Sequence, residues 1–411
     1  MKPSHDGDLA IVHLLGEAWR TCPRRPHVAA NSKYARVLCI ERARRQLAGS
    51  AVAARDGNGT LRQVSESLWL YEPSRLLPHL VAASCGPAGW LNKRLLREQV
   101  HSVLKRLNFE QPAVIVAHPL LGYLADIFPA SVICYEVTDN WATWGGGRGL
   151  AKLLAARAED RLLSRCDVVV ASAYALYQDK AARHERTFYV PNSAEVDHFK
   201  PPENGAPAPP ADLAELPRPW IGFAGNIMDA IDMDLLAASM QLRPDWSWVF
   251  VGRVNGSPAF VGSAAFRAWR HCPNAHQLGW RDYEVLPQYV RAFDVCILPY
   301  ARGTVMYGAL PNKIFQYLAA GRPVVSTRFP ETAFLPDDLR EALHIADTPE
   351  QFCDAIHRAL AADCQERRRQ RVRVAEANSC DVRARQRVQI LRECVAEGAG
   401  RHQQRECSKA R

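Results

Sequence analysis

The sequence predicts an α/β protein of two domains, each built on a doubly wound parallel sheet. Three observations lead to this fold class. The 411 residues exceed one ordinary core and suit two domains of ~150–200 residues. Short apolar runs alternate with helical patterns along both halves, as in β-α-β units. A Pro-rich segment, residues 201–210, separates the halves and cannot fold on its own.

Composition narrows the class of protein. The hydrophobic fraction of 48% is ordinary for a globular chain. No run approaches the ~20 apolar residues of a membrane span, and the N-terminus lacks the apolar core of a signal peptide. The 12 cysteines are scattered, without a Cys-x-x-Cys pair or a metal-binding spacing. These features indicate a cytoplasmic protein with reduced thiols. The net charge of +9 and pI of about 9.0 indicate an anionic partner: a nucleotide, lipid head groups or nucleic acid.

The first half reads as a series of buried strands separated by helices. No Gly-x-Gly-x-x-Gly follows a strand, so an ordinary dinucleotide fold is not expected. Residues 42–60 read as an exposed basic excursion, and Gly145–Gly147 as a mobile loop. The basic helix at 91–107 fits a solvated face as well as a membrane-surface or acceptor-facing patch. We expect strands at 9–15, 37–41, 67–71, 113–117, 132–137, 167–172 and 187–192, and helices at 28–35, 91–107, 150–163 and 174–183.

The second half repeats the β-α-β order after the Pro-rich segment. Gly222, Gly225 and Gly252 stand at or beside strand ends, where a pyrophosphate could approach the backbone, although ordinary turns explain them equally well. The last residues are rich in arginine. We expect strands at 220–225, 246–252 and 294–300, helices at 231–236 and 283–289, a helix over 373–397 and a disordered basic tail at 398–411.

Residues 310–327 form the most informative stretch. Pro311 fits the first turn of a helix, Gly321 its end, and Val324-Val325 the start of a buried strand. Lys313 and Gln316 share a stripe near the helix N-terminus, where free N–H groups and a cation suit a phosphate. A surface helix with a solvated lysine is the alternative that spacing alone leaves open.

Two polar residues follow neighbouring strands of the first half. His118 comes after the strand 113–117, and Asp139 after the strand 132–137. Open α/β sheets bind ligands outside the carboxyl ends of their strands, so both positions suit chemistry. A structural hydrogen bond for the histidine and a simple turn for the aspartate remain the alternatives.

The stretch Asn312-Lys-x-Phe-x-Tyr-Leu-Ala-Ala-Gly-x-Pro-Val-Val325 resembles the nucleotide-sugar-binding helix of GT-B glycosyltransferases of group 1. Its Lys-x-x-Gln pattern is similar to xanthan-type glucuronosyltransferases. In the first half the Arg25-Pro-His27 segment, the strand ending in His118-Pro119 and the Tyr135-x-x-x-Asp139 segment resemble teichuronic-acid-type and xanthan-type enzymes. The stretch Val190-Pro-Asn-Ser-x-x-x-Asp197 matches them too.

The resemblance implies a GT-B fold: two Rossmann-like domains facing across a cleft, with a final helix crossing back to the first. The domains are then 1–199 for the acceptor, a linker at 200–217, 218–372 for the nucleotide sugar, the crossing helix 373–397 and the tail 398–411. It also implies a metal-independent hexosyl- or glucuronosyltransferase, without a cofactor. Its partners would be a UDP- or GDP-type donor sugar and a glycan or lipid-linked acceptor. From charge alone, the basic first domain also suits a lipid-diphosphate acceptor and peripheral contact at the inner face of an anionic membrane.

The resemblance also assigns residue roles. Asp139 would act as base or acceptor anchor and His118 would orient the sugar. Arg25 and His27 would lie on the acceptor side. A base at Asp139 favours inversion, whereas much of the related superfamily retains. The donor would be held by Gly225, Arg253, Tyr300, Asn312, Lys313 and Gln316.

Two departures from the family pattern keep an alternative open. Gly308 and Gln316 stand where many retaining members have glutamates, and residues 226–232 are acidic where relatives place cations. A catalytically inactive sugar-nucleotide or polysaccharide-binding protein of the same fold is therefore the second hypothesis. A sugar-nucleotide epimerase fits the helix motif less well. A nucleic-acid-binding protein ranks low, because the arginine clusters contain no stacking aromatics.

Overall fold

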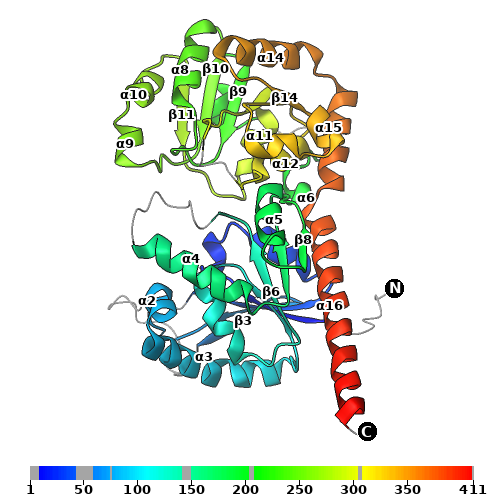
Figure 1. Cartoon of the computed structure of the whole chain (residues 1–411). Coiled ribbons are helices and arrows are strands. Elements are labelled where there is room, and N and C mark those ends of the chain that lie inside the picture. The colour runs from blue at the N-terminus through cyan, green and yellow to red at the C-terminus, as the bar shows by residue number, and fades with distance from the viewer. Residues whose placement is uncertain are drawn as a thin grey trace. The chain divides into compact units, whose positions relative to one another are not determined.

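The computed structural model describes residues 9–42, 59–74, 76–140, 150–202, 208–303 and 308–409, with the side chains of residue 151 and of residues 399–409 left out. It divides the chain into two compact units. Unit 1 comprises Met1–Pro191 and Asp381–Arg411, and unit 2 comprises Asn192–Cys380 (Figure 1). The expected excursion at 43–58 and the glycine loop Gly145–Gly147 lie outside the described residues.

Unit 1 holds an eight-stranded sheet in the order β3-β4-β2-β1-β5-β6-β7-β8. All neighbours pair in parallel except β3 with β4, which are antiparallel. The doubly wound parallel sheet predicted for this half is therefore confirmed, with an added edge strand. The strands are β1 (Ala10–Leu14), β2 (Arg36–Ile40), β3 (Thr60–Ser65), β4 (Leu68–Glu72), β5 (Ala113–Val116), β6 (Val132–Val137), β7 (Val168–Ala171) and β8 (Thr187–Tyr189).

The helices of unit 1 cover this sheet because its strands are apolar on both faces. Its core joins strand residues to Val388, Leu391 and Cys394 of the last helix, α16 (Cys380–Lys409), which runs beside the sheet in Figure 1. The other helices are η1 (Trp19–Thr21), α1 (Arg25–Asn31), α2 (His79–Ser84), α3 (Gly86–Arg106), η2 (Pro119–Ile127), α4 (Leu150–Leu163) and α5 (Tyr174–Ala181).

Unit 2 holds a six-stranded, fully parallel sheet in the order β11-β10-β9-β12-β13-β14. This is the second parallel sheet that the sequence predicts. The strands are β9 (Trp220–Ala224), β10 (Ser247–Val251), β11 (Ala275–Gly279), β12 (Val295–Leu298), β13 (Val324–Ser326) and β14 (Leu343–Ile345).

Helices lie on both faces of the unit 2 sheet, and α12 (Asn312–Ala319) leads directly into β13. They are α6 (Val196–Phe199), α7 (Ala211–Ala214), α8 (Met233–Leu242), α9 (Pro258–Val261), α10 (Ala264–Arg270), α11 (Leu286–Ala292), η5 (Pro330–Ala333), α13 (Asp337–Glu341), α14 (Pro349–Ala362) and α15 (Gln365–Ala377).

Several element boundaries differ from those expected. Helix α1 begins at Arg25 and not near residue 28, because Pro26 fits a first helical turn. A single helix does not span 373–397: α15 ends at Ala377 and α16 begins at Cys380. Helix α16 continues to Lys409, although residues 398–411 were expected to be disordered. Arg, Ala and Gln, all good helix formers, recur in this segment.

Candidate active site

The carboxyl ends of β9 and β10 form the glycine-lined part of the site in unit 2. Gly225 and Gly252 have φ of +151° and +156°, which side-chain-bearing residues rarely adopt. A Cβ on Gly252 would lie 1.9 Å from the carbonyl oxygen of Gly225. The two backbones therefore meet closely, as the strand-end glycines suggested. Gly222 has another reason: a Cβ there would lie 2.1 Å from the Phe293 ring, inside the core.

Helix α12 starts beside these glycines with its N-terminal N–H groups uncapped by side chains. Pro311 precedes it, and its first turn contains no acidic residue. Ile314 and Phe315 are fully buried. The Tyr317 hydroxyl accepts a hydrogen bond from the Ala224 N–H at 2.9 Å and donates to the Ala224 carbonyl at 3.3 Å. This bond fixes the helix against the end of β9.

Lys313 lies over Gly225. A Cβ on that glycine would be 2.1 Å from Lys313 Cε and 2.7 Å from Nζ, so only hydrogen there leaves room for the lysine side chain. The ammonium is 5.8 Å from the centre of the Phe223 ring. Burial lowers the pKa of Lys313. In the part of the chain that the structure describes, no carboxylate pairs with this ammonium. It is a cation placed to receive an anion.

Asn312 and Gln316 flank Lys313 on the same helix. Both side chains are partly buried. Asn312 Oδ1 is buried without a hydrogen-bond partner among the described residues. An amide can both donate and accept, so each residue suits hydroxyl or phosphate oxygens.

Arg253 and Tyr300 differ in their surroundings. Arg253 follows Gly252 and is exposed, and its guanidinium lies 4.5 Å from the centre of the Trp280 ring. The place of Trp280 beside Arg253 was not predicted, because Trp280 follows β11 (Ala275–Gly279), a strand that was not expected. Tyr300 is buried with its ring edge-on to Phe329, and burial raises the pKa of its hydroxyl. Because Tyr300 is buried, it suits the wall of the site, whereas a residue that contacts the nucleotide directly would have to be exposed.

The acidic segment 226–232 uses two of its carboxylates in local structure. Asp229 accepts hydrogen bonds from the Ser257 N–H at 2.8 Å and hydroxyl at 2.5 Å. Asp232 caps α8 by accepting from the Leu235 N–H at 2.9 Å, and so precedes the helix rather than lying within it. These bonds explain acidic residues at a place where relatives carry cations.

In unit 1, His118 begins η2 at the carboxyl end of β5. Its Nδ1 accepts a hydrogen bond from the Leu120 N–H at 3.1 Å. Burial, with the nearby Arg24 and His79, lowers the pKa of His118 to about 4. The ring is therefore neutral at pH 7 and carries its proton on Nε2. Such a ring donates a hydrogen bond and does not act as a strong base.

Asp139 lies at the carboxyl end of β6, next to β5 in the sheet. Its Oδ2 accepts a hydrogen bond from the Thr138 hydroxyl at 3.0 Å. Glu17, which follows β1, is close enough to be affected by the Asp139 charge, and burial raises the pKa of Glu17. Polar residues from three neighbouring strand ends thus gather at one edge of the sheet.

A cluster of charged side chains around the buried Glu136 lies next to these strand ends. The Glu136 carboxylate lies 3.0 Å from Arg387, 3.1 Å from Arg24 and 3.4 Å from His13. The Arg387 and Arg24 charges and a hydrogen bond from His13 hold the pKa of Glu136 well below its usual range, against the effect of burial. Arg24 also donates to the Ala117 carbonyl at 2.8 Å. It therefore joins β6 to the residue before His118.

Sequence reasoning missed this cluster. It singled out Arg25 and His27, which lie in the first turn of α1 and are partly buried. The arginine that contacts the strand ends is Arg24, one residue earlier. A glutamate inside the otherwise apolar run 132–137 was the available signal, since a buried charge needs a partner.

The described residues contain no group of three metal-binding side chains, and none of their helices is long and apolar enough to cross a membrane. Neither observation identifies the ligands. The residues that define the candidate site are Lys313, Gly225 and Gly252 in unit 2, and His118 and Asp139 in unit 1.

The sequence of the chain is similar to that of known proteins. Residues 218–362 match the family model for glycosyl transferases group 1. TuaH of Bacillus subtilis (strain 168), whose name assigns it to teichuronic acid biosynthesis as a glycosyltransferase, is 26% identical over 269 residues. That match covers 63% of this chain and 66% of TuaH, slightly less than two thirds of either.

Solved structures share the fold over almost the whole chain. Sucrose-phosphate synthase from Thermosynechococcus elongatus has a TM-score of 0.65 at 14% identity, covering 95% of this chain and 100% of that one. Anabaena HepE in complex with UDP and glucose has a TM-score of 0.61 at 12% identity, covering 93% and 98%. These identities show the fold alone. The chain therefore has the GT-B fold, and its residues 218–362 are similar to the glycosyl transferases of group 1.

Proposed function

We propose that this chain transfers a sugar from a nucleoside diphosphate sugar to a hydroxyl of a glycan or lipid-linked acceptor. The observation that carries the proposal is Lys313, a partly buried cation without a carboxylate partner in the described chain, at the uncapped start of α12. A diphosphate would supply the missing negative charge. UDP is the first candidate, because a structural neighbour was solved with UDP and glucose.

In this proposal unit 2 holds the donor. The diphosphate oxygens would accept hydrogen bonds from the Lys313 ammonium and from the first N–H groups of α12. Gly225 would leave room for the Lys313 side chain beside the phosphates, and Gly252 for the backbone of Gly225. Gln316 would bond a ribose or sugar hydroxyl. As the bond between the anomeric carbon and the diphosphate breaks, the leaving group gains negative charge, which Lys313 would offset.

Unit 1 would act on the acceptor. The acceptor hydroxyl would lose its proton to the Asp139 carboxylate as its oxygen bonds to the anomeric carbon, while the diphosphate takes the electron pair of the broken bond. His118, neutral at pH 7, would donate from Nε2 to an oxygen of the sugar. No step in this scheme needs a metal ion or a cofactor, and the lysine takes the place of a cation at the diphosphate.

A thermal-shift screen of UDP, GDP, ADP and their sugars tests the donor half. Ligand at about 100 times its Kd should raise the melting temperature by about 5–10 °C. Lys313→Ala should abolish the shift, whereas Lys200→Ala should keep it. Lys200 is the matched control because it is the other lysine of unit 2, and it pairs with Glu376. A full shift in Lys313→Ala would reject the site.

Turnover separates the enzyme from an inactive binding protein of the same fold. Gly308 and Gln316, where many relatives have glutamates, favour that second candidate. Release of UDP from a donor sugar above background, lost in Asp139→Ala, supports the transferase. Nucleotide binding without any release of UDP, with acceptors present, supports the binding protein.

A further inference from the structure

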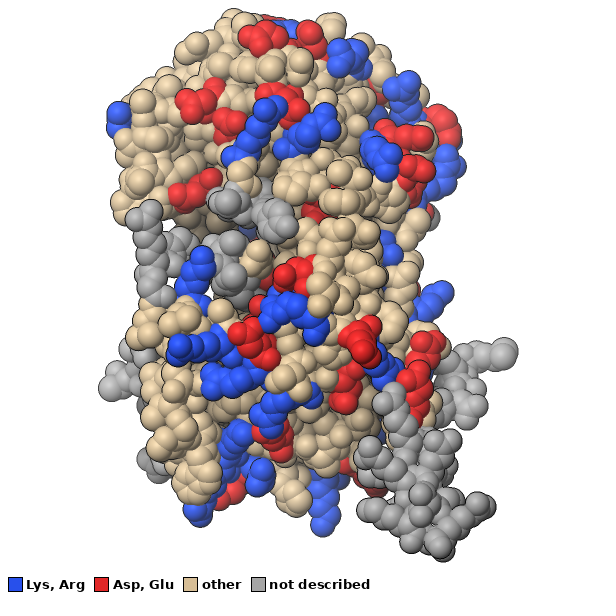
Figure 2. Space-filling view, viewed as in Figure 1, with Lys and Arg blue, Asp and Glu red and all other residues tan. Residues whose placement is uncertain are grey.

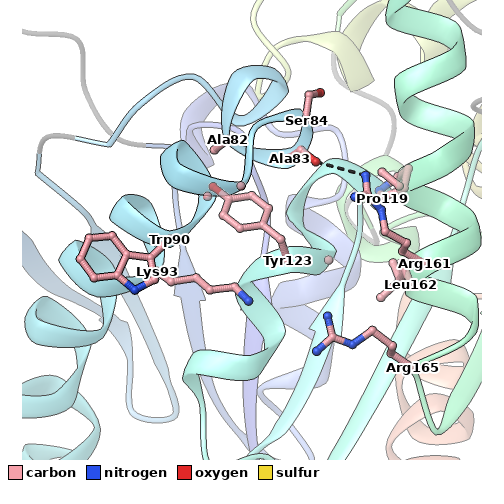
Figure 3. Close-up of a pocket in the computed structure, with 14 residues that line it drawn as sticks. Ala82, Ala83, Ser84, Trp90, Lys93, Pro119, Tyr123, Arg161, Leu162 and Arg165 are labelled. Atoms are coloured by element: carbon pink, nitrogen blue, oxygen red, sulfur yellow. Dashed lines mark hydrogen bonds between the residues drawn. The ribbon is translucent and has the colours of Figure 1, made fainter.

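Unit 1 carries a cavity of about 320 Å³ that reaches the end of β5 at Pro119, the residue after His118. Helices α2 and α3 form one side, and η2 and α4 the other. Figure 3 shows Lys93 from α3 and Arg165, just beyond α4, extending toward the same space, with Tyr123 between the two sides. Every residue that lines the cavity belongs to the described part of unit 1.

The charges around this cavity are mainly positive. Lys93 and Arg165 both pair with Asp126, at 2.8 Å and 2.7 Å. Arg161 donates to the carbonyl oxygens of Ala83 and Arg157, and no carboxylate balances its charge in the described chain. One carboxylate therefore faces three cations. In Figure 2, Lys and Arg side chains gather over the part of unit 1 where α4 runs.

Exposed apolar side chains lie on α2 and α3, two of the helices that form the cavity. Trp90 is 60% exposed, Val81 50%, Leu80 40% and Leu91 39%. The Arg94 guanidinium lies 5.7 Å from the centre of the Trp90 ring. Tryptophan and arginine side by side, with aliphatic side chains, are typical of surfaces that enter the interface of a bilayer. We call these four residues and the cavity cations the α2–α3 patch.

The α2–α3 patch is built on a rigid support. Asn92 is fully buried, accepts from the Leu77 N–H at 2.8 Å and donates to the Tyr123 hydroxyl at 2.9 Å. His79 of α2 bonds the same hydroxyl at 3.0 Å. A Cβ on Gly89 would lie 2.6 Å from the Ala82 carbonyl, so the two helices touch closely. These contacts fix α2 and α3, the helices that carry the exposed side chains, without a binding partner.

We propose that the α2–α3 patch docks unit 1 on the surface of an anionic phospholipid bilayer. Trp90 and the aliphatic residues would enter the headgroup region, and Lys93, Arg161 and Arg165 would bind lipid phosphates. Charge complementarity selects this partner, because an apolar protein partner would not require three cations around one carboxylate. The proposal deepens the proposed function and rests on it, since a lipid-linked acceptor would be met at such a surface.

The test is co-sedimentation of the full chain with vesicles of phosphatidylcholine, with and without about 30 mol% phosphatidylglycerol. We expect binding only to the anionic vesicles, weakening as salt is added. Arg161→Gln should weaken partition about fivefold, the effect of one charge near the surface. Trp90→Ser should weaken it too. Arg369→Gln and Phe334→Ser remove an exposed cation and an exposed aromatic residue from unit 2, and should leave partition unchanged.

A variant expected to strengthen binding controls for the possibility that the other variants lose binding because they misfold. Asp126→Asn removes the carboxylate that pairs with Lys93 and Arg165, so it should strengthen partition about fivefold. Absence of binding to anionic vesicles, equal binding to neutral ones, or unchanged binding in Arg161→Gln and Trp90→Ser would each overturn the proposal. The UDP thermal shift reports on the donor site independently. If the chain binds vesicles but UDP causes no thermal shift, the proposed function is rejected and the membrane surface is not. If UDP causes a thermal shift but the chain does not bind anionic vesicles, the membrane surface is rejected and the proposed function is not.

Discussion

Gly225→Ala tests whether the lysine over β9 binds the diphosphate. The new methyl group would lie 2.1 Å from Lys313 Cε and 2.7 Å from Nζ, far inside van der Waals contact. The end of a lysine side chain is flexible, so the ammonium should move while the fold remains. At φ of +151° the backbone of an alanine is strained as well, which costs about 1–3 kcal/mol of stability.

The magnitude follows from the bond that would be lost. A hydrogen bond to a charged group contributes about 1.5–3 kcal/mol, so displacing the ammonium should weaken UDP binding about 10- to 150-fold. Lys313→Ala removes the same interaction. If the alanine acts only by moving Lys313, the double variant should bind UDP no more weakly than Lys313→Ala alone.

Isothermal titration of UDP into the wild type, both single variants and the double variant measures these effects. Gly303→Ala is the matched control. Gly303 has a φ of +133°, so alanine there is also strained, but among the described residues no atom lies within 4 Å of its would-be Cβ apart from its chain neighbours. It should lose stability and keep UDP affinity. Multiplicative losses in the double variant, or equal losses at Gly303 and Gly225, would refute the reasoning.

Three further predictions concern unit 1. Glu136→Gln should lower the free energy of unfolding by about 3–5 kcal/mol in urea titrations, because the buried Arg387 and the partly buried Arg24 lose their carboxylate. Glu98→Gln, which breaks an exposed pair, should cost under about 0.5 kcal/mol, and similar costs would contradict the account. His118 has its pKa lowered to about 4, so the unfolded chain takes up its proton first as pH falls, and stability drops by up to about 3 kcal/mol between pH 6.5 and 4. His118→Asn keeps an acceptor for the Leu120 N–H and should flatten that drop, and an unchanged pH profile would argue against it. Asp139→Ala should abolish turnover and leave UDP affinity unchanged, and residual full activity would remove Asp139 from the mechanism.

Regular local patterns made the fold predictable from sequence. The apolar runs of β1, β5 and β7 are fully buried, as parallel strands require, and the proline and glycine that bound α12 act as the local rules predict. Strand β3 was missed because it is an exposed, largely polar edge strand that carries no apolar run. Helix α2 was missed because six residues give too little periodicity.

The chemistry of the site was harder to predict, because it depends on contacts between distant residues. Lys313 and Gly225 are recognisable separately, but only the structure shows that one leaves room for the other. The cluster of Glu136, Arg24 and Arg387 joins three segments that share no motif. Trp280 beside Arg253 depends on β11, which sequence patterns did not reveal. The roles of His118 and Asp139 in a reaction stay predictions.

Unit 1 is formed by two stretches that are far apart in the sequence, and this affects how it folds during synthesis. Glu136 leaves the ribosome long before Arg387, and at ordinary rates of synthesis the delay is on the order of tens of seconds. Until α16 emerges, the nascent sheet holds a carboxylate without one of its two arginines, and an apolar surface that Val388 and Leu391 later cover. A chain that stops before α16 would leave this apolar surface uncovered, which favours aggregation.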